Sequence, residues 1–482
     1  MNTDIEQAIA NLRINSTRYA KPERYYNGDH DLAFATEKFQ NTFGTLFREF
    51  ALNLCPVICD AVRDKLRVTG FGVDDVGTRS ASLRVVDSQA GSLRSDAQRI
   101  WHRNRMATRA GEIHKESLRS GDAYAIVWPN SRGEAVIYPN KAANITVAYD
   151  DESPGRIVWA AKAWRLADKH IRLNLLYPDR IEKYVSRGES EGSLPDAKDF
   201  VAFGGSKLQV SGSKPEGTPG TLNLELGTVP NPYGVVPVFH FANNADLGMV
   251  GRSELETAIP VQDGLNKSVL DMLVAMEFSA YRQRWAAGIE IEIDADGKAV
   301  APFTAGVDHL WITENPNARF GDFDAAQLEQ FLKVKDSFRV DIASVTGTPL
   351  HYFLQTAGDF PSGESLKKAE TRFLAKVRDR QESFGQVWAD VMSFALMIEG
   401  RGRDIRLITE WEDPAPMSDR EFLENILLKK QIGLPVEQAL LEAGYGEVDV
   451  RRMLARNLEE ESNLRGRRLR AGASPIRAKL RP

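Results

Sequence analysis

Two cysteines are the first residues whose type and spacing could support chemistry, either as metal ligands or as a redox pair. Cys55 and Cys59 lie four residues apart in an apolar pattern with helical spacing, and no histidine lies near them in the sequence. Zinc usually takes four ligands, and cysteines on successive helical turns are poorly placed to form a disulfide. We therefore expect two buried, free thiols that pack as small hydrophobic side chains.

The histidines and carboxylates offer no clearer catalytic group. The seven histidines are scattered, and none has a second ligand close by at metal spacing. His240 alternates with Val238 in a strand pattern, which predicts a hydrogen-bonded core or interface histidine. The acidic runs 150–152 and 459–461 are typical of solvated surfaces. A two-metal nuclease would need acids that converge from separate strands, and no pattern points to one, so we expect no metal and no cofactor.

The common nucleotide-binding and catalytic motifs do not occur. There is no Gly-x-x-x-x-Gly-Lys-Ser/Thr phosphate loop, no Gly-x-Gly-x-x-Gly after a strand, and no His-Glu-x-x-His. Residues 188–192 match Gly-x-Ser-x-Gly by letters, but their flanks are polar and acidic. A nucleophile elbow needs a buried strand before it and a helix after it, so we expect a chance match and no enzymatic activity.

Composition is that of an ordinary globular protein. The chain has 482 residues, of which 42% are hydrophobic and 27% are charged, so more than one domain is expected. A formal net charge of −5 gives no overall basic signature of a tight DNA binder. No apolar run is long enough to span a membrane, and the N-terminus does not read as a secretory signal. A reducing cytosol is the expected compartment.

Hydrophobic periodicity predicts an α+β fold. Helices are expected over residues 4–14, 37–66, 92–120, 253–285, 325–344, 364–399, 419–430, 436–442 and 448–457. Strands are expected over 123–128, 134–138, 145–149, 156–164, 171–177, 235–241 and 405–411, the first five as one antiparallel meander. Two further strand candidates lie within 289–311 around a turn at 294–297, residues 24–29 read as a turn, and 187–228 reads as a loop or partly disordered insert.

Three residues bear on the ends of these helices. Pro56 either bends or restarts the helix at 37–66, and Pro260 either kinks or restarts the helix at 253–285. Ser253 is expected to cap that second helix, because a serine oxygen can accept from the free N–H groups of a first turn.

The segment QTAGDFPSGE, residues 355–364, joins two of the expected long helices. It is longer than a helical hairpin needs, and such loops are usually functional or disordered. Gly358 and Gly363 supply backbone freedom, and no lysine or arginine occurs from 355 to 363.

The order of these elements resembles the portal proteins of tailed bacteriophages, of the kind found in siphophages of Gram-positive and actinobacterial hosts. Several short motifs at matching places carry the resemblance: RYYNG at 24–28, NLC at 53–55 with Asp60, Leu66 and GF at 70–71, GVVPV at 234–238 before GRSEL at 251–255, and DFPSGE at 359–364. Each motif is weak alone, but their order across nearly the whole chain is specific.

This resemblance implies a portal fold with a wing, a helical stem, a small β clip between the stem helices and a C-terminal helical crown. The implied parts are a wing over 1–252, a first stem helix over 253–285, a clip over 286–324, a second stem helix over 325–346, a tunnel loop over 347–363, a long wing helix and strand over 364–412, and a crown with a basic tail over 413–482.

The resemblance also implies site residues. The channel-facing tunnel loop would consist of Gln355, Thr356, Ala357, Gly358, Asp359, Phe360, Pro361, Ser362 and Gly363. The clip residues that would contact a terminase or an adaptor are Glu290, Glu292, Asp294, Asp296, Lys298 and Asp308. The basic tail contains Arg465, Arg467, Arg468 and Arg470, which could contact packaged DNA or scaffold.

The function that the resemblance implies is a conduit and docking platform rather than catalysis. A closed ring of about twelve subunits would stand at one capsid vertex, assembled in the host cytoplasm, and double-stranded DNA would pass through it. The implied partners are the terminase large subunit, a head–tail adaptor, the major capsid protein and scaffold, with no membrane. The alternatives are another oligomeric virion protein of the tail or baseplate, and a nucleic-acid-processing enzyme with undetected carboxylates.

Overall fold

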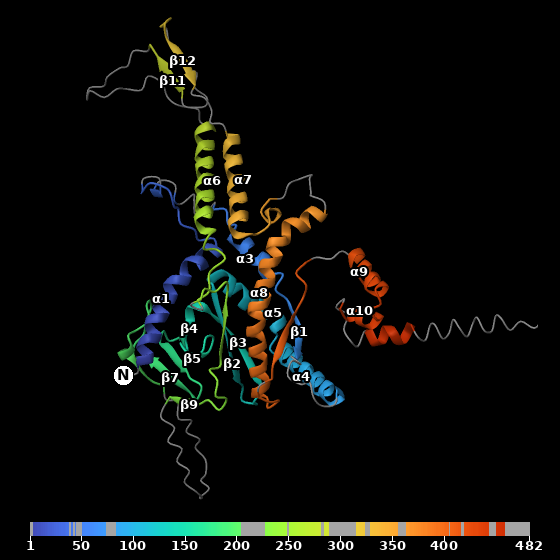
Figure 1. The fold of residues 1–482 in the computed structure, drawn as a ribbon. Helices are drawn as coiled ribbons and strands as arrows, with labels where there is room; N and C mark the ends of the chain where they lie inside the picture. The colour runs from blue at the N-terminus through green and yellow to red at the C-terminus, as the bar shows by residue number, and fades with distance from the viewer. Residues whose placement is uncertain are drawn as a thin grey trace, which may run out of the picture. The chain divides into compact units, whose positions relative to one another are not determined.

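The chain divides into two units, residues 1–414 and 415–482. The structure is a computed structural model, and it describes residues 3–37, 40–41, 44, 51–73, 83–203, 227–247, 250–280, 284–288, 315–322, 328–354, 363–403, 405–415, 419–442 and 450–457. Both helices and sheets form in the first unit, as the periodicity predicted (Figure 1).

An antiparallel sheet, called here the six-stranded sheet, lies in the N-terminal half of the first unit. Its strands are β4 (Ile145–Tyr149), β5 (Ile157–Arg165), β6 (Ile171–Leu176), β7 (Arg180–Ser186), β8 (Phe200–Ala202) and β9 (Thr228–Pro230). They follow the order β4-β5-β6-β7-β8, and β9 also pairs with β7. The meander was therefore correctly predicted for β4 to β6, whereas β7 was missed. The prediction of a loop or partly disordered insert over 187–228 was wrong at β8 and at the first residue of β9, because each strand has only three residues and sits among Gly, Ser and Pro.

The two faces of the six-stranded sheet bury different partners, since side chains alternate along each strand. Helix α1 (Thr3–Tyr26) covers one face. There, its apolar residues pack with every second residue of the sheet, in a cluster that includes Ile5, Ile9, Leu12, Trp159, Ala161, Leu173 and Leu175. The intervening residues point to the opposite face and form a second cluster, which includes Ala160, Leu176, Ile181, Tyr124, Ile126 and Val238.

That second cluster lies between the six-stranded sheet and a separate three-stranded sheet of order β10-β2-β3. The strands are β2 (Asp122–Pro129), β3 (Ala135–Lys141) and β10 (Val238–Ala242). The prediction of one meander from residue 123 to 177 was wrong here. Strand β2 pairs with β10, more than a hundred residues later, and this distant pairing has no local signature in the sequence.

Helices α5 (Met106–Ser120) and α8 (Gly363–Ile398) cover the other face of the three-stranded sheet (Figure 1). The main core of the first unit lies between these helices and the sheet, and it includes the aromatic residues Phe71, Trp101, Phe241, Phe384 and Trp388. Strands β1 (Val68–Val73) and β13 (Leu407–Trp411) pair with each other and pack against α4 (Leu83–Arg103) and α8. Helix α8 confirms the long helix predicted over 364–399.

The helix boundaries expected near the N-terminus needed correction. Helix α1 does not stop at residue 14 but continues through Pro22 to Tyr26, so the turn expected at 24–29 begins only after Tyr26. Tyrosine hydroxyls hold the extra turns, because Tyr19 donates to Asp122 at 2.6 Å and Tyr25 donates to Asp263 at 2.7 Å.

Two further helices also depart from expectation. The described part of the predicted helix 37–66 includes α3 (Cys55–Arg63), which Pro56 restarts in its first turn. The predicted helix 92–120 is broken into α4 and α5 at Arg105, whose φ of 54° places it in the left-handed region. A long-range contact favours that break, since the Asn104 side chain bonds Ile137 N and Ala135 O of β3.

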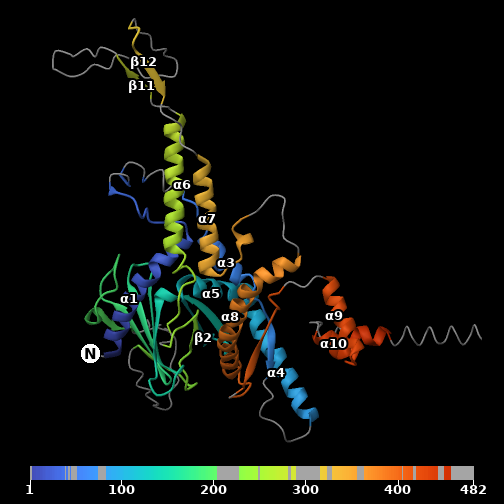
Figure 2. The same ribbon diagram turned by 45° about the horizontal axis from the view of Figure 1, so that its top comes forward.

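The helical hairpin is formed by α6 (Ile259–Ala280) and α7 (Leu328–Thr346), which run side by side in both ribbon views (Figures 1 and 2). The hairpin strands β11 (Arg284–Ala287) and β12 (Arg319–Asp322) pair where α6 ends and α7 begins. The prediction of a helix starting at Ser253 and reaching residue 285 was wrong at both ends. Pro260 lies in the first turn of α6, which begins only at Ile259. The Ser253 hydroxyl donates to Arg119 O and accepts from Leu255 N at 3.0 Å, so it caps the turn before α6 rather than the helix itself.

In the second unit, α9 (Asp419–Gln431), α10 (Val436–Glu442) and a helical stretch at 450–457 follow one another, as predicted. Several apolar side chains of this unit are more than half exposed, among them Leu423, Leu427, Leu428 and Ile432.

Candidate functional site

The site residues expected from the sequence fall almost entirely outside the described residues. This holds for the loop from Gln355 to Ser362, the six clip residues from Glu290 to Asp308, and the four arginines from Arg465 to Arg470. Gly363 is described, as the first residue of α8. Their roles therefore stay predictions, and the candidate site is built from the described segments that flank them.

The surface of the helical hairpin is unusually apolar for an exposed surface. Along α6 and α7 the large apolar side chains with more than 40% of their surface exposed are Met276, Leu332, Val334, Val340 and Val345. Trp285 and Phe320 of β11 and β12 are exposed to a similar degree, at 40% and 43%. Such a set on one slender element marks an interaction surface, since the two helices cannot bury it against each other.

The two helices approach closely at one glycine. A β-carbon at Gly264 of α6 would lie 2.9 Å from the ring of Phe338 of α7, so the ring occupies the space of the missing side chain. Buried residues at this end include Leu265, Val269 and Ile342, which belong to the main core. The base of the hairpin is therefore anchored in the first unit.

The chain that precedes α6, residues 251–254, is the anchor segment. It crosses the junction of α5 and β2 so closely that a β-carbon on Gly251 would lie 1.9 Å from Gly121 O. Backbone hydrogen bonds hold it, from Glu254 N to Leu118 O at 2.9 Å and from Arg252 N to Asn243 O at 2.7 Å. Only glycine fits at this crossing, which explains the residue types found there.

An ion-pair cluster joins the anchor segment to α8 and α7. The carboxylate of Glu254, 9% exposed, pairs with Lys376 and with Arg380 Nη2, the latter at 3.1 Å. Lys376 Nζ also donates to Thr346 O, at the end of α7, at 3.0 Å. One lysine of α8 thus contacts the chain at both feet of the hairpin.

Electrostatics keep Glu254 ionised. Burial alone would raise the pKa of Glu254, but the charges of Lys376 and Arg380 and the Asn243 hydrogen bond hold it below its usual value. A cavity of about 510 Å³ opens beside the cluster and is lined by Arg252, Gly347 and Arg372 among others. The cluster connects the base of the helical hairpin to α8.

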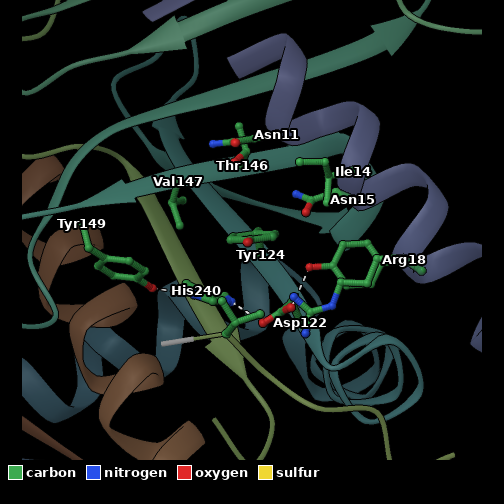
Figure 3. A pocket seen from close by; sticks show the side chains of 12 residues that line it. Asn11, Ile14, Asn15, Arg18, Asp122, Tyr124, Thr146, Val147, Tyr149 and His240 are labelled. Carbon is green, nitrogen blue, oxygen red and sulfur yellow. Dashed lines mark hydrogen bonds and ion pairs between the residues drawn. The ribbon is translucent and has the colours of Figure 1, made fainter. Parts of the chain in front are cut away.

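A second polar cluster lies between α1 and the two sheets (Figure 3). Asp122, with a side chain 1% exposed, accepts from His240 Nε2 at 2.8 Å, Tyr19 OH at 2.6 Å and Gly251 N at 2.8 Å. The other ring nitrogen of His240 accepts from Tyr149 OH at 2.5 Å. The prediction that His240 is hydrogen-bonded and buried is therefore confirmed.

This second cluster superficially resembles a catalytic triad, with an acid, a histidine and a hydroxyl. Burial and the charge of Asp122 raise the pKa of Tyr149, and burial likewise raises that of Tyr19. Neither hydroxyl is therefore activated as a nucleophile, since ionisation is disfavoured for both. The cluster instead holds α1, β2 and β10 together beside the anchor segment.

The cysteines agree with their predicted role. Cys55 and Cys59 are buried free thiols in α3. Burial raises the pKa of Cys55 to about 12, so its thiolate is suppressed at neutral pH. Among the described residues, no group of three or more histidine, cysteine or acidic side chains is arranged to hold a metal ion. No helix among the same residues is long and apolar enough to cross a membrane.

Comparison with known proteins gives a consistent result. A sequence profile described as "Phage portal protein, SPP1 Gp6-like" matches residues 7–464. The "Portal protein" of Mycobacterium phage L5 is 30% identical over 253 residues, which cover 49% of this chain and 51% of that protein. The "Portal protein" of Mycobacterium phage D29 is 28% identical over 254 residues, covering 50% and 51%. The chain thus aligns with about half the length of these curated relatives.

Solved structures give a weaker likeness. The neck of a native gene transfer agent particle, computed with C12 symmetry, is 14% identical with a TM-score of 0.43, and the match covers 86% of this chain and 95% of that one. The neck of an empty particle, computed with C6 symmetry, is 11% identical with a TM-score of 0.44 over the same shares. Because both TM-scores are below 0.5, no conclusion rests on them.

Proposed function

Since the chain belongs to the SPP1 Gp6-like family of phage portal proteins, we propose that it assembles into a closed ring at one capsid vertex, through which DNA is packaged and later ejected. The observation that carries the proposal is the exposed apolar surface of α6 and α7. A neighbouring copy would bury that surface, and cyclic closure leaves no interface unpaired.

The parts of the ring follow from the chain order. The α+β body to residue 252 is the wing, and α6 and α7 are the stem. Residues 286–324, of which 286–288 and 315–322 are described, are the clip that meets the terminase and later the head–tail adaptor. The segment 347–363 carries the tunnel loop, α8 crosses the wing, and the second unit is the crown, within a ring of about twelve subunits.

The mechanism is that of a conduit and platform. DNA translocation would be driven by a separate terminase, while this chain supplies the channel and the docking surfaces for the adaptor, the major capsid protein and scaffold. The absence of lysine and arginine from 355–363 suits a sliding contact, because ring-wide phosphate pairing would hold DNA tightly.

The test is the state of assembly of the purified full-length chain. Class averages in negative stain and native mass spectrometry should show closed rings with a central channel. The double variant Leu332→Asp with Val340→Asp should shift the protein towards monomers, because it places charge on the proposed interface. Val158→Asp, at a valine of β5 that is 42% exposed against 46% for Val340, is the matched control and should leave rings intact.

A stable monomer at micromolar concentration, without rings at any salt concentration, would contradict the proposal. So would a double variant that assembles as well as the control.

A further inference from the structure

A groove between the two sheets has no role in the function proposed above. It lies where the apolar cluster between the sheets gives way to polar side chains, on the face of the six-stranded sheet opposite α1. The residues that line it come from six strands: Ile126, Trp128, Tyr138, Lys162, Trp164, Asn174, Leu176, Ile181, Lys183 and Val229. Its volume of about 280 Å³ is near the lower end of the range for small-ligand sites, roughly 300–1,000 Å³.

Strand register places a row of polar side chains across the floor of this groove. Lys162 of β5 lies opposite Asn174 of β6, and Asn174 lies opposite Lys183 of β7. The three side chains therefore point to one face of the sheet. The next row contains Trp164 and, opposite it, Arg172. Three cations thus share one face of three adjacent strands.

These cations lack counter-charges. None of Lys162, Arg172 and Lys183 takes part in an ion pair within the described part of the chain, and no residue lining the groove is acidic. Burial lowers the pKa of both Lys162 and Arg172, so their positive charges are partly desolvated. Aromatic rings give partial compensation, with Lys162 Nζ 5.1 Å from the ring centre of Trp164 and Arg172 Cζ 3.4 Å from that of Phe203. A partly desolvated group of like charges favours the binding of an anion.

The groove also offers an acceptor and an apolar wall. The Asn174 side-chain oxygen is buried and has no hydrogen-bond partner among the described residues, so it can accept from a ligand N–H. Leu176, Ile181 and Val229 lie beside the polar row, and Trp128 stands across from it. The matching ligand therefore combines a carboxylate, an N–H donor and an apolar or aromatic group within a few ångströms.

We propose that this groove binds a peptide segment of a partner protein in which an acidic residue stands next to a leucine or an aromatic residue. A backbone N–H of the segment would donate to Asn174, and its carboxylate would accept from Lys162 and Lys183. A peptide is the better match, because its carboxylate, its backbone N–H and its apolar side chain lie within a few ångströms of one another, as the cations, Asn174 and the apolar wall do in the groove. The proposal does not depend on ring formation.

The test uses the full-length protein and a fluorescein-labelled peptide of twelve residues, Glu-Leu-Asp-Phe repeated three times. Anisotropy should show saturable binding. Lys162→Met with Lys183→Met should weaken that binding at least tenfold, since two charge-assisted contacts are lost. Lys169→Met, at an exposed lysine in the turn between β5 and β6 that pairs with Glu191, is the control and should bind like the unmodified protein.

Any of the following results would overturn the proposal. The first is no binding of the acidic peptide up to millimolar concentration. The second is equal binding of a matched peptide with Gln and Asn in place of Glu and Asp, or equal binding by the double variant. The third is binding of a single-stranded oligonucleotide but not of the peptide. Thermal unfolding of the double variant gives a folding check, because removing two unpaired cations should not lower its melting temperature.

Discussion

Among single residues, His114 shows most clearly how burial sets chemistry in this protein. Its side chain is fully buried in the main core, where Trp388 Nε1 donates to its Nε2 at 2.8 Å and Phe384 stacks on its ring. Burial lowers the pKa of His114 to about 3. The ring is therefore neutral and acts as a hydrogen-bond acceptor for tryptophan.

This neutral histidine predicts a pH dependence of stability. In the unfolded chain His114 takes up a proton below about pH 6.5, whereas in the folded chain it does so only near pH 3. The contribution of the neutral His114 ring to the free energy of unfolding is fully present above pH 6.5. It is lost as pH falls towards 3, at about 1.4 kcal/mol per pH unit. The melting temperature of the unmodified protein should fall between pH 7 and 5, and that of His114→Phe should fall less. Equal slopes for both proteins would contradict this assignment.

The ion-pair cluster gives a second prediction for a single residue. Glu254→Gln leaves Lys376 and Arg380 without their shared carboxylate, and loss of one member of a buried pair costs about 3–5 kcal/mol. Urea unfolding should show that loss. Glu256→Gln, two residues along and exposed, is the control and should change the free energy of unfolding by less than about 0.5 kcal/mol.

Sequence reasoning reached some of these residues and not others. The free, buried state of Cys55 and Cys59 followed from their apolar helical pattern. The role of Glu254 could not be inferred from the sequence, because its partners Lys376 and Arg380 lie more than a hundred residues away along the chain. Lys376 and Arg380 are four residues apart in the sequence, but this spacing is common on solvated helices and does not identify an acidic partner.

Among the elements, the helical hairpin depends on one close contact. Gly264→Leu would force Phe338 out of its place, and such overpacking costs about 1–3 kcal/mol. Adding Phe338→Ala should restore part of the stability, because it frees the space that leucine needs. Urea unfolding of both single variants and the double variant measures this coupling. Additive losses would mean that the two residues do not share the contact.

The segment 355–363 gives a prediction at the same scale. Gly358→Val would stiffen the proposed tunnel loop, and Asp359→Arg would add one cation per subunit. Rings should form with both variants, while DNA packaging into procapsids should slow or stall. The measurement is the DNA length packaged against time. Rates equal to those of the unmodified protein for both variants would mean that the loop is a passive connection.

Elements with strong periodicity were predictable, and long-range pairings were not. The 36 residues of α8 were found almost to their ends, because apolar residues recur along its whole length. The split into two sheets was missed, since β2 and β10 meet only through tertiary structure. The break at Arg105 was missed for a similar reason, as the Asn104 contacts with β3 are not visible locally.

For the whole molecule, the arrangement of parts proposed from family membership predicts a dispensable C-terminus. Residues 465–481 contain six arginines, two glycines and a proline, a composition that predicts little apolar surface to bury. Deletion after Ser462 should leave rings intact but alter packaging or scaffold binding. Electron microscopy checks the rings, and a packaging assay checks the function. Failure of the truncated chain to form rings would make the tail a structural part.

At this scale the sequence supported the family, since the resemblance depends on motif order along the chain, while the order of parts stays a prediction. It could not supply the groove of Lys162, Asn174 and Lys183. That row exists only after the register of three strands is set, and one residue of slippage would turn every side chain to the other face.

The contacts of Lys376 have a mechanical consequence. Its ammonium group contacts Glu254 before α6 and Thr346 at the end of α7, so α8 grips both feet of the hairpin at one point. A sideways load on the far end of the hairpin would be delivered to α8 as a torque, and the two helices would swing together as one lever. Helix α8 begins at Gly363, directly after the segment 355–362. The point about which the hairpin would turn, Lys376, therefore lies on the helix that follows this segment.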